Sequence, residues 1–376
     1  MKNWETKSFE DCIEPVKYTK KIPSKDYKDE GLYPIISQED ELISGYWDSE
    51  DDIFKVNSPV VIFGDHTRVL KYVDFDFVLG ADGVKILQPK EFLDAKYFLY
   101  FLKNTNIKSL GYARHYRLLK ELEILLPPLE EQKRIVKNLD EKFAQLETVK
   151  ANAKSNLQNA KDLLFAELTK TFEQESWETM SLQDVCTRKI TDGTHQTPKY
   201  CTQEEGGYPF ISSKDVTKEY IDWTKIKYIV PELHEELYKR IAPQKDDVLL
   251  AKNGTTGVAA IVEDDKVFDI YVTLAVLRPN KEIVNPRYLL AIVNSPLCKE
   301  QFNAHLKGSG VPNLHLEEIQ KVIIPVPPLN EQESVVKKIE NLKLKVHEIE
   351  EIYTKQLANC DELKQAFLAK SFAGKL

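Results

Sequence analysis

The sequence predicts an α+β protein: two mixed α/β domains separated by a pair of long antiparallel coiled-coil helices, with a pseudo-twofold internal repeat. Three observations predict this class. A segment of eleven residues recurs 200 residues further along the chain. Each copy is followed by apolar residues at the spacing of a coiled coil. The stretches in front of the copies contain short strand patterns that end in polar, glycine-containing loops.

The repeated segment carries most of this prediction. Its copies are Leu-Pro-Pro-Leu-Glu-Glu-Gln-Lys-Arg-Ile-Val at 126–136 and Val-Pro-Pro-Leu-Asn-Glu-Gln-Glu-Ser-Val-Val at 326–336, with six of eleven positions identical. The same register continues downstream without a gap, to Phe172 and Phe372. Upstream, Trp-Glu-Thr and Tyr-Pro also recur, but at shorter offsets, at 4–6 and 177–179 and at 33–34 and 208–209. The interiors of the two halves therefore differ in length, whereas the helical parts do not.

These matches set the expected domain boundaries. We expect the first domain at 1–125, the first helix at 126–174, the second domain at 175–325 and the second helix at 326–376.

Each helical segment shows apolar positions in alternating steps of three and four. The first seam consists of Val136, Leu139, Phe143, Leu146, Lys150, Ala153, Leu157, Ala160 and Leu164; the second consists of Val335, Ile339, Leu342, Val346, Ile349, Tyr353, Gln356, Cys360, Leu363 and Phe367. Proline suits a helix start because its φ is fixed near the helical value. If the first helix leads into the second domain, the second must return along it, so we expect an antiparallel pair. The alternative is two amphipathic helices that belong to the domain cores.

The two domains show polar loops at the ends of predicted strands, where backbone can approach a ligand closely. Apolar runs at 59–63 and 248–251 lead into Gly-Asp-His-Thr-Arg at 64–68 and Lys-Asn-Gly-Thr-Thr-Gly at 252–257. The segment 191–200 is the densest polar cluster, and further polar groups precede each helix at 114–117 and 313–315.

Side chains of these types read base edges in DNA or hold phosphates. The candidate DNA-binding residues are His66, Thr67, Arg68, Arg114, His115 and Arg117 in the first half, and Thr194, His195, Gln196, Lys199, Lys252, Asn253, Thr255, Asn313 and His315 in the second. The alternative is that these are polar surface loops without a ligand.

Composition limits the remaining classes. A hydrophobic share of 42% with 30% charged residues is ordinary for a soluble chain. The sequence has neither a membrane-length apolar stretch nor a signal peptide at its start, so we expect a cytoplasmic protein without a membrane partner. The net charge of −8 means that any DNA contact comes from local patches or is shared with a partner protein. Five scattered cysteines without a CxxC pair predict reduced thiols and no zinc site.

No catalytic constellation is evident, so we expect no enzyme activity, metal or cofactor in this chain. Asp65-His66 lacks a third ligand or a nucleophile. The glycine loops at 254–257 and 308–310 lack the Lys-Ser/Thr of a phosphate loop. The Pro-Pro pairs lack the preceding Asp/Asn and the following aromatic residue that an amino-methyltransferase uses.

Over its whole length, the chain resembles the specificity subunits of type I restriction-modification systems. The resemblance rests on the doubled Pro-Pro-Leu-x-Glu-Gln at 127–132 and 327–332, each opening a long helix, and on the segments 64–68, 112–116 and 192–198. It implies two target-recognition domains that each read half of a bipartite, asymmetric site in double-stranded DNA, with the helices setting the spacing.

The same resemblance implies partners. Two methyltransferase subunits would dock on the helices, and restriction subunits would join for cleavage, giving type I site-specific deoxyribonuclease activity only at the level of the complex. The methyl donor and ATP would belong to those partners. A coiled-coil scaffold with protein-binding end domains is the alternative, and an enzyme using the Asp65-His66 loop comes third.

Overall fold

The computed structural model describes residues 4–81, 83–111, 113–216, 219–305 and 313–373. The chain forms two compact units. Unit 1 comprises Met1–Lys154 and Thr354–Leu376, and unit 2 comprises Ser155–Tyr353. Each unit therefore combines one mixed α/β domain with parts of both long helices. Among the described residues, no helix has the length and apolar composition that crossing a membrane requires.

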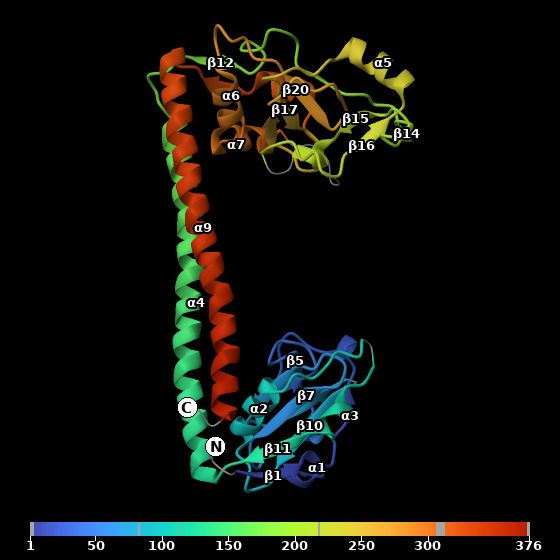
Figure 1. Ribbon diagram of the computed structural model, residues 1–376, viewed down its shortest axis with the longest axis vertical. Coiled ribbons are helices and arrows are strands. Elements are labelled where there is room, and N and C mark those ends of the chain that lie inside the picture. The colour runs from blue at the N-terminus through green and yellow to red at the C-terminus, as the bar shows by residue number, and fades with distance from the viewer. Residues whose placement is uncertain (1–3, 82, 112, 217–218, 306–312, 374–376) are drawn as a thin grey trace. The chain divides into compact units, whose positions relative to one another are not determined.

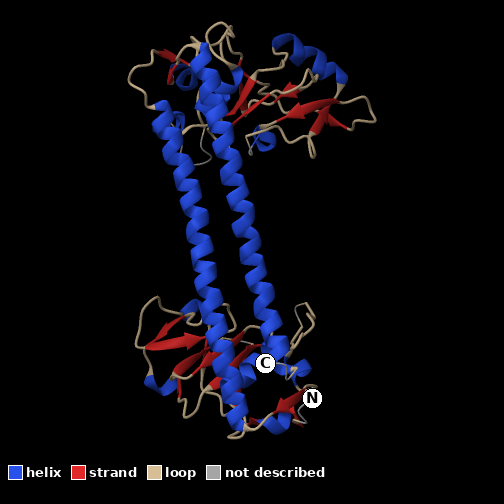
Figure 2. Ribbon diagram, turned by 60° about the vertical axis from the view of Figure 1, so that its left-hand side comes forward, coloured by secondary structure: helices blue, strands red, loops and turns tan. Residues whose placement is uncertain are grey.

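The long helices are α4 (Leu129–Phe172) and α9 (Leu329–Phe372), each of 44 residues and lying side by side in both views (Figures 1 and 2). Within unit 1, Lys364 Nζ contacts Glu147 at 3.2 Å and Lys150 Nζ contacts Asp361 at 2.5 Å. Residue numbers therefore rise along α4 in the direction in which they fall along α9, as in an antiparallel pair. Unit 2 shows the same order, in the pairs Asn156–Tyr353 (3.0 Å), Lys161–Glu350 (3.7 Å) and Glu167–Lys338 (3.3 Å). The antiparallel prediction is confirmed.

The predicted seams are buried or half-buried along both helices, with one exception. Leu363 is 45% exposed, so its assignment to the seam was wrong. The reason is that the last turns of α9 pack on the domain of unit 1, where Leu368 and Phe372 enter the core. The buried stripe therefore shifts from Leu363 to the side of the helix that carries these two residues.

Unit 1 contains three short helices and eleven strands in its described part. The helices are α1 (Phe9–Cys12), α2 (Ala95–Asn104) and α3 (Tyr116–Leu119). The strands are β1 (Glu5–Ser8), β2 (Ile13–Glu14), β3 (Lys21–Ile22), β4 (Tyr33–Ile36), β5 (Gly45–Trp47), β6 (Ile53–Phe54), β7 (Val60–Gly64), β8 (Leu70–Val73), β9 (Phe77–Gly80), β10 (Val84–Pro89) and β11 (Glu123–Leu126). They form sheets of order β3-β9-β4-β5, with β6 also on β9, then β2-β10-β7-β8, and β1-β11.

Unit 2 has a related set of elements. Its helices are α5 (Pro231–Arg240), α6 (Pro286–Val293), α7 (Pro296–Ala304) and α8 (Leu316–Lys321). Its strands are β12 (Thr179–Ser181), β13 (Thr191–Asp192), β14 (Tyr200–Cys201), β15 (Tyr208–Ile211), β16 (Lys227–Ile229), β17 (Val248–Ala251), β18 (Ala259–Ile261), β19 (Asp269–Ile270), β20 (Leu274–Leu277) and β21 (Ile323–Pro325). The sheets have the orders β13-β20-β17-β18, β14-β16-β15-β19 and β12-β21.

The two domains repeat one topology, which confirms the internal repeat. The recurring Tyr-Pro pair opens β4 in unit 1 and β15 in unit 2. Each of these strands pairs in parallel with a later strand, β9 or β19. The antiparallel set β10-β7-β8 likewise corresponds to β20-β17-β18. Between β16 and β17, however, unit 2 inserts α5, whereas unit 1 has only a 3₁₀ turn at Glu50–Asp52 between β5 and β6. This insertion accounts for part of the difference in length.

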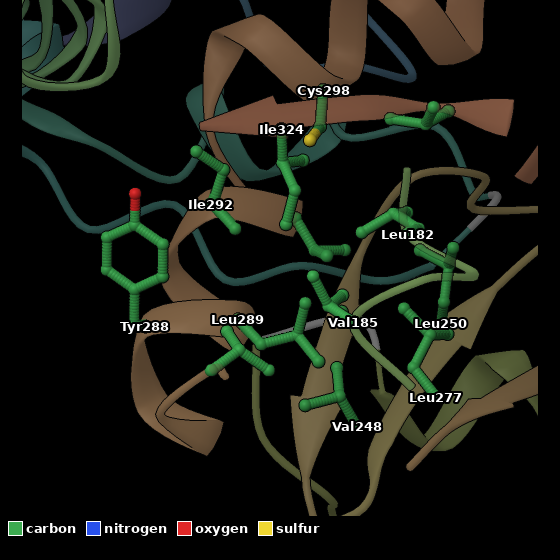
Figure 3. Close-up of a cluster of buried hydrophobic side chains, with 14 of the residues drawn as sticks. Leu182, Val185, Val248, Leu250, Leu277, Tyr288, Leu289, Ile292, Cys298 and Ile324 are labelled. Carbon is green, nitrogen blue, oxygen red and sulfur yellow. The ribbon is translucent and has the colours of Figure 1, made fainter. Parts of the chain in front are cut away.

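Each domain buries one face of its sheet under a helix. In unit 2, Val248 and Leu250 of β17 and Leu277 of β20 belong to one buried cluster with Leu289 and Ile292 of α6; all five are labelled in Figure 3. Strands whose residues are nearly all buried lose water from both faces, and this apolar burial is the main stabilising contribution.

The repeated glutamine of each Pro-Pro-Leu-x-Glu-Gln motif holds a helix start on its domain. Gln132 is 1% exposed. Its Oε1 accepts from the backbone N–H of Asp94, the N-cap of α2, at 2.8 Å. Its Nε2 donates to the carbonyls of Phe92 and Pro127, both at 2.9 Å. One amide thus satisfies three backbone groups that are buried or part-buried, which explains why glutamine stands at this position.

Gln332 makes the same three bonds in unit 2. It accepts from Asn285 N, at the N-cap of α6, at 2.8 Å, and donates to Ile283 O at 2.9 Å and Pro327 O at 2.7 Å.

The end of the other long helix also packs on each domain, through an aromatic contact. Phe372 meets Tyr97 in unit 1 and Phe172 meets Tyr288 in unit 2, with ring centroids 5.3 and 5.8 Å apart. Each domain is therefore held by the start of one long helix and the end of the other.

Candidate nucleic-acid interface

In unit 1, Asp65 joins two of the polar segments that the sequence singled out. Its carbonyl accepts from His115 N at 2.8 Å and lies 2.9 Å from His115 Nδ1. Its carboxylate accepts from Tyr116 N at 2.7 Å. Because Asp65 follows β7 directly, these bonds place the 64–68 loop beside the 114–117 segment, 50 residues further along the chain.

His115, one of the predicted DNA contacts, lies in the interior of unit 1. The ring is fully buried, and its Nε2 accepts from Leu110 N at 2.9 Å. Because Nδ1 also lies 2.9 Å from Asp65 O, both ring nitrogens are used within the fold. His115 holds the two segments together and has no atom available to a ligand.

The other candidates in unit 1 reach the surface. Thr67, Arg68, Arg114 and Arg117 are exposed and His66 is half-buried. Arg68 has a left-handed backbone, with φ of 64°, and donates from its guanidinium to Ile107 O at 2.9 Å. We call these five residues surface 1.

A further loop, 37–44, lies against surface 1 and was not a candidate. Thr67 Oγ1 donates to Gln38 O at 2.6 Å, and His66 N donates to Gln38 Oε1 at 3.3 Å. The loop is held from inside by Lys71, a buried lysine that donates to the carbonyls of Ser37 and Glu41. The signal that could have found it is its position directly after the repeated Tyr-Pro strand.

In unit 2, Asp192 is the corresponding centre. Its carboxylate lies 3.2 Å from Lys252 Nζ, 3.3 Å from His195 Nε2 and 3.6 Å from Arg240. Lys252 is buried beside this carboxylate, and Thr194 is also buried, with its hydroxyl accepting from Gln196 N at 3.1 Å. Both residues support the loop from inside, so we leave these two predicted DNA contacts out of the surface defined below.

The backbone brings the other predicted segments of unit 2 to the same place. Leu314 N donates to Lys252 O at 2.8 Å, and Asn253 and Asn313 form an isolated β-bridge. Thr255 Oγ1 lies 3.4 Å from Ser213 O, in the loop after β15. A cleft of about 390 Å³ lies between these segments, lined by Asp192, His195, Lys252, His315 and residues 316–318. Seven candidate residues reach the surface here, and we call them surface 2. The exposed ones are His195, Gln196, Lys199, Thr255 and His315, and the half-buried ones are Asn253 and Asn313.

The chemistry of both surfaces suits recognition. Amide, hydroxyl, imidazole and guanidinium groups can donate to or accept from base edges and phosphates. Asp65 is buried, and its carboxylate accepts a hydrogen bond from Tyr116 N. In the part of the chain that the structure describes, no group of three His, Cys, Asp or Glu side chains is placed to hold a metal. The geometry therefore gives the Asp65-His66 enzyme hypothesis no support.

Comparison with known proteins also supports DNA recognition. The model of the type I restriction modification DNA specificity domain matches the chain twice, at residues 1–158 and 174–358. The chain belongs to this family. Among curated members, the specificity subunit of the EcoBI type I restriction enzyme of Escherichia coli is 24% identical over 89% of this chain and 76% of its own length. The MjaVIII specificity subunit of Methanocaldococcus jannaschii is 22% identical over 100% of this chain and 93% of its own.

Solved structures share the specificity-subunit fold. A chain from a structure of a type I restriction-modification system aligns over 100% of this chain and 99% of its own, with a TM-score of 0.75 and 17% identity. The HsdS subunit of Thermoanaerobacter tengcongensis aligns over 100% and 98%, with a TM-score of 0.57 and 18% identity. Each family match covers one mixed α/β domain and the first part of the long helix that follows it, so both halves of the chain contain a specificity domain.

Proposed function

We propose that this family member is the non-catalytic DNA specificity subunit of a type I restriction-modification complex. Surface 1 reads one half of a bipartite, asymmetric DNA site and surface 2 reads the other. The observation that carries the proposal is the repeated construction: in each unit, the loop after a central strand, β7 or β17, is bonded to the segment before the short helix α3 or α8. Polar side chains that differ between the units are presented from equivalent places.

Different side chains on one framework are what a reader of two unlike half-sites requires. Surface 1 offers mainly arginines, and arginine contacts guanine bidentately or holds phosphate. Surface 2 offers Gln196 and Asn253, and the amides of Gln and Asn pair bidentately with adenine. The two surfaces therefore favour different bases, which gives an asymmetric site.

We propose further that two methyltransferase subunits dock on the helices, one in each unit. Leu163 on α4 and Leu363 on α9 are equivalent in the repeat and are 55% and 45% exposed. Leu163 belongs to unit 2 and Leu363 to unit 1. Equivalent exposed leucines on equivalent segments suit two copies of one partner. Restriction subunits would join for cleavage, and the methyl donor and ATP would be bound by these partners.

The test is to combine the purified chain with the methyltransferase subunit that accompanies it and a DNA library, and to map the methylated adenines. We expect two fixed half-sites with an unread gap, and neither methylation nor cleavage by the chain alone. A coiled-coil scaffold with protein-binding ends would leave methylation without a defined sequence.

Substitution of one surface should change one half-site only. We expect Gln196→Ala to relax the half read by unit 2, and Arg114→Ala to relax the other, each by about 1–3 kcal/mol per lost base contact. The methylation map of each variant measures this. Gln174→Ala removes an exposed glutamine outside surface 2 and serves as the control. A single substitution that relaxed both halves equally would contradict the assignment of one reader to each unit.

A further inference from the structure

Helix α5 of unit 2 ends against the loop that carries His195 and Gln196. Its last residue, Arg240, lies 3.6 Å from the Asp192 carboxylate, with its side chain 52% exposed. Arg188 donates to the carbonyl of Arg240 at 3.4 Å. The insertion that distinguishes unit 2 from unit 1 therefore brings Arg240 to the edge of surface 2, where Arg188 bonds to its backbone.

Asp192 is already paired with the buried Lys252, at 3.2 Å, so Arg240 is a second and more distant cation beside this carboxylate. The cleft beside them is also lined by Glu317 and Glu318. A half-exposed ion pair at 3.6 Å adds little to stability, so it gives no structural reason for Arg240. An anion that approaches surface 2 would find its guanidinium accessible, and the phosphate backbone of DNA is such an anion.

A buried pair fixes the helix that carries Arg240. His234 of α5 lies with Nδ1 2.7 Å from Asp269 Oδ2 on β19, and both residues are buried. The histidine ring stacks on Tyr208 of β15, with centroids 3.6 Å apart and planes at 12°. Among the described residues, Asp269 Oδ1 has no hydrogen-bond partner. The Asp269 carboxylate is therefore held through Oδ2, by its bond to His234. Burial raises the pKa of the Asp269 carboxyl, against the lowering effect of His234.

The strand that contains Asp269, β19, also contacts the loop that contains His195 and Gln196. Thr194 N donates to the carbonyl of Ile270, the residue after Asp269, at 3.3 Å. A Cβ on Gly193 would lie 2.0 Å from that same carbonyl oxygen, so only glycine allows the loop to lie so close to the strand. Strand β19 therefore sets the position of α5 relative to the loop.

We propose that Arg240 contacts the DNA phosphate backbone beside the half-site read by surface 2, and that His234 and Asp269 position it there. This inference rests on the proposed function. Arg240 adds affinity without sequence information, and unit 1 has only the 3₁₀ turn Glu50–Asp52 at the place of α5. The two half-sites are therefore bound with unequal dependence on salt.

The first experiment measures the salt dependence of DNA binding by the assembled methyltransferase complex. We expect Arg240→Ala to lower the slope of log K against log[salt] by roughly 0.9, the value for one phosphate contact, and by the same amount on target and unrelated DNA. Arg240→Lys should keep the wild-type slope. Arg287→Ala is the matched control, because Arg287 is 50% exposed and paired with Glu263 at 2.8 Å near the opposite end of the sheet. An unchanged slope for Arg240→Ala, or a loss confined to certain bases, would overturn the phosphate contact.

The second experiment tests the positioning pair. Asp269→Asn keeps an oxygen that accepts from His234, so it should keep the wild-type slope. Asp269→Leu removes the acceptor and should reproduce the lower slope of Arg240→Ala, with no further decrease in the double variant. Variants are compared only after thermal unfolding shows that unit 2 is folded. A wild-type slope for folded Asp269→Leu would overturn the positioning role. If the methylation map of the wild-type complex showed no defined half-sites, the proposed function would be overturned, whatever the slopes of log K against log[salt].

Discussion

Gln132→Ala should lower the free energy of unfolding of unit 1 by about 3 kcal/mol, because it leaves three buried or part-buried backbone groups without their partner. These are the N–H of Asp94 and the carbonyls of Phe92 and Pro127. Gln132→Glu should be at least as destabilising at neutral pH, since its carboxylate would face two carbonyl oxygens. Hydrogen exchange of the amides in α2 and the first turns of α4, together with thermal unfolding, measures the effect.

The control for this prediction is an exposed glutamine on the same helix. Gln158 donates to Asp162 at 2.8 Å on the surface of α4, and its replacement by alanine should cost less than about 0.5 kcal/mol. Gln332→Ala should weaken unit 2 by as much as Gln132→Ala weakens unit 1, because its three bonds are the same. If both buried glutamines could be replaced without loss of stability, the repeated motif would need another explanation.

Lengthening both long helices together should change the unread gap of the DNA site. We expect four residues inserted after Lys154 and after Tyr353 to add about 6 Å to each helix. At about 3.4 Å per base pair, this corresponds to one or two extra base pairs. Both half-sites should stay the same, because surfaces 1 and 2 are untouched. The methylation map of the variant gives the result directly.

The insertion points follow from the packing of the helix pair. Asn156 bonds to Tyr353, so the two points lie opposite each other and the layers on either side keep their partners. Insertion in α4 alone should instead offset pairs such as Lys150–Asp361 and reduce both stability and methylation. An unchanged gap in the doubly lengthened variant, or a change in the bases recognised, would mean that the helices do not measure DNA.

The sequence by itself determined the repeat, the two long helices, their antiparallel order and the mixed α/β class. These features follow from signals that are read along the chain: identical residues at a constant offset, apolar steps of three and four, and proline before a helix start. It also indicated which polar loops reach the surface, because glycine-containing loops at strand ends are exposed in most folds. The seam prediction failed only at Leu363, because the last turns of α9 pack on the domain of unit 1 through Leu368 and Phe372, and periodicity does not report such packing.

Only the tertiary structure decided which of the candidate polar residues are exposed and which hold the loops. His115, Thr194 and Lys252 have the same side-chain chemistry as their exposed neighbours, so local sequence cannot separate them. Their burial depends on Asp65 and Asp192, on backbone partners far along the chain, and on the strands beneath. The same holds for Gln132, Arg240 and the His234–Asp269 pair. A hydrogen bond between residues 35 or 50 positions apart leaves no periodic mark in a sequence, because it exists only once the sheet has brought both ends together.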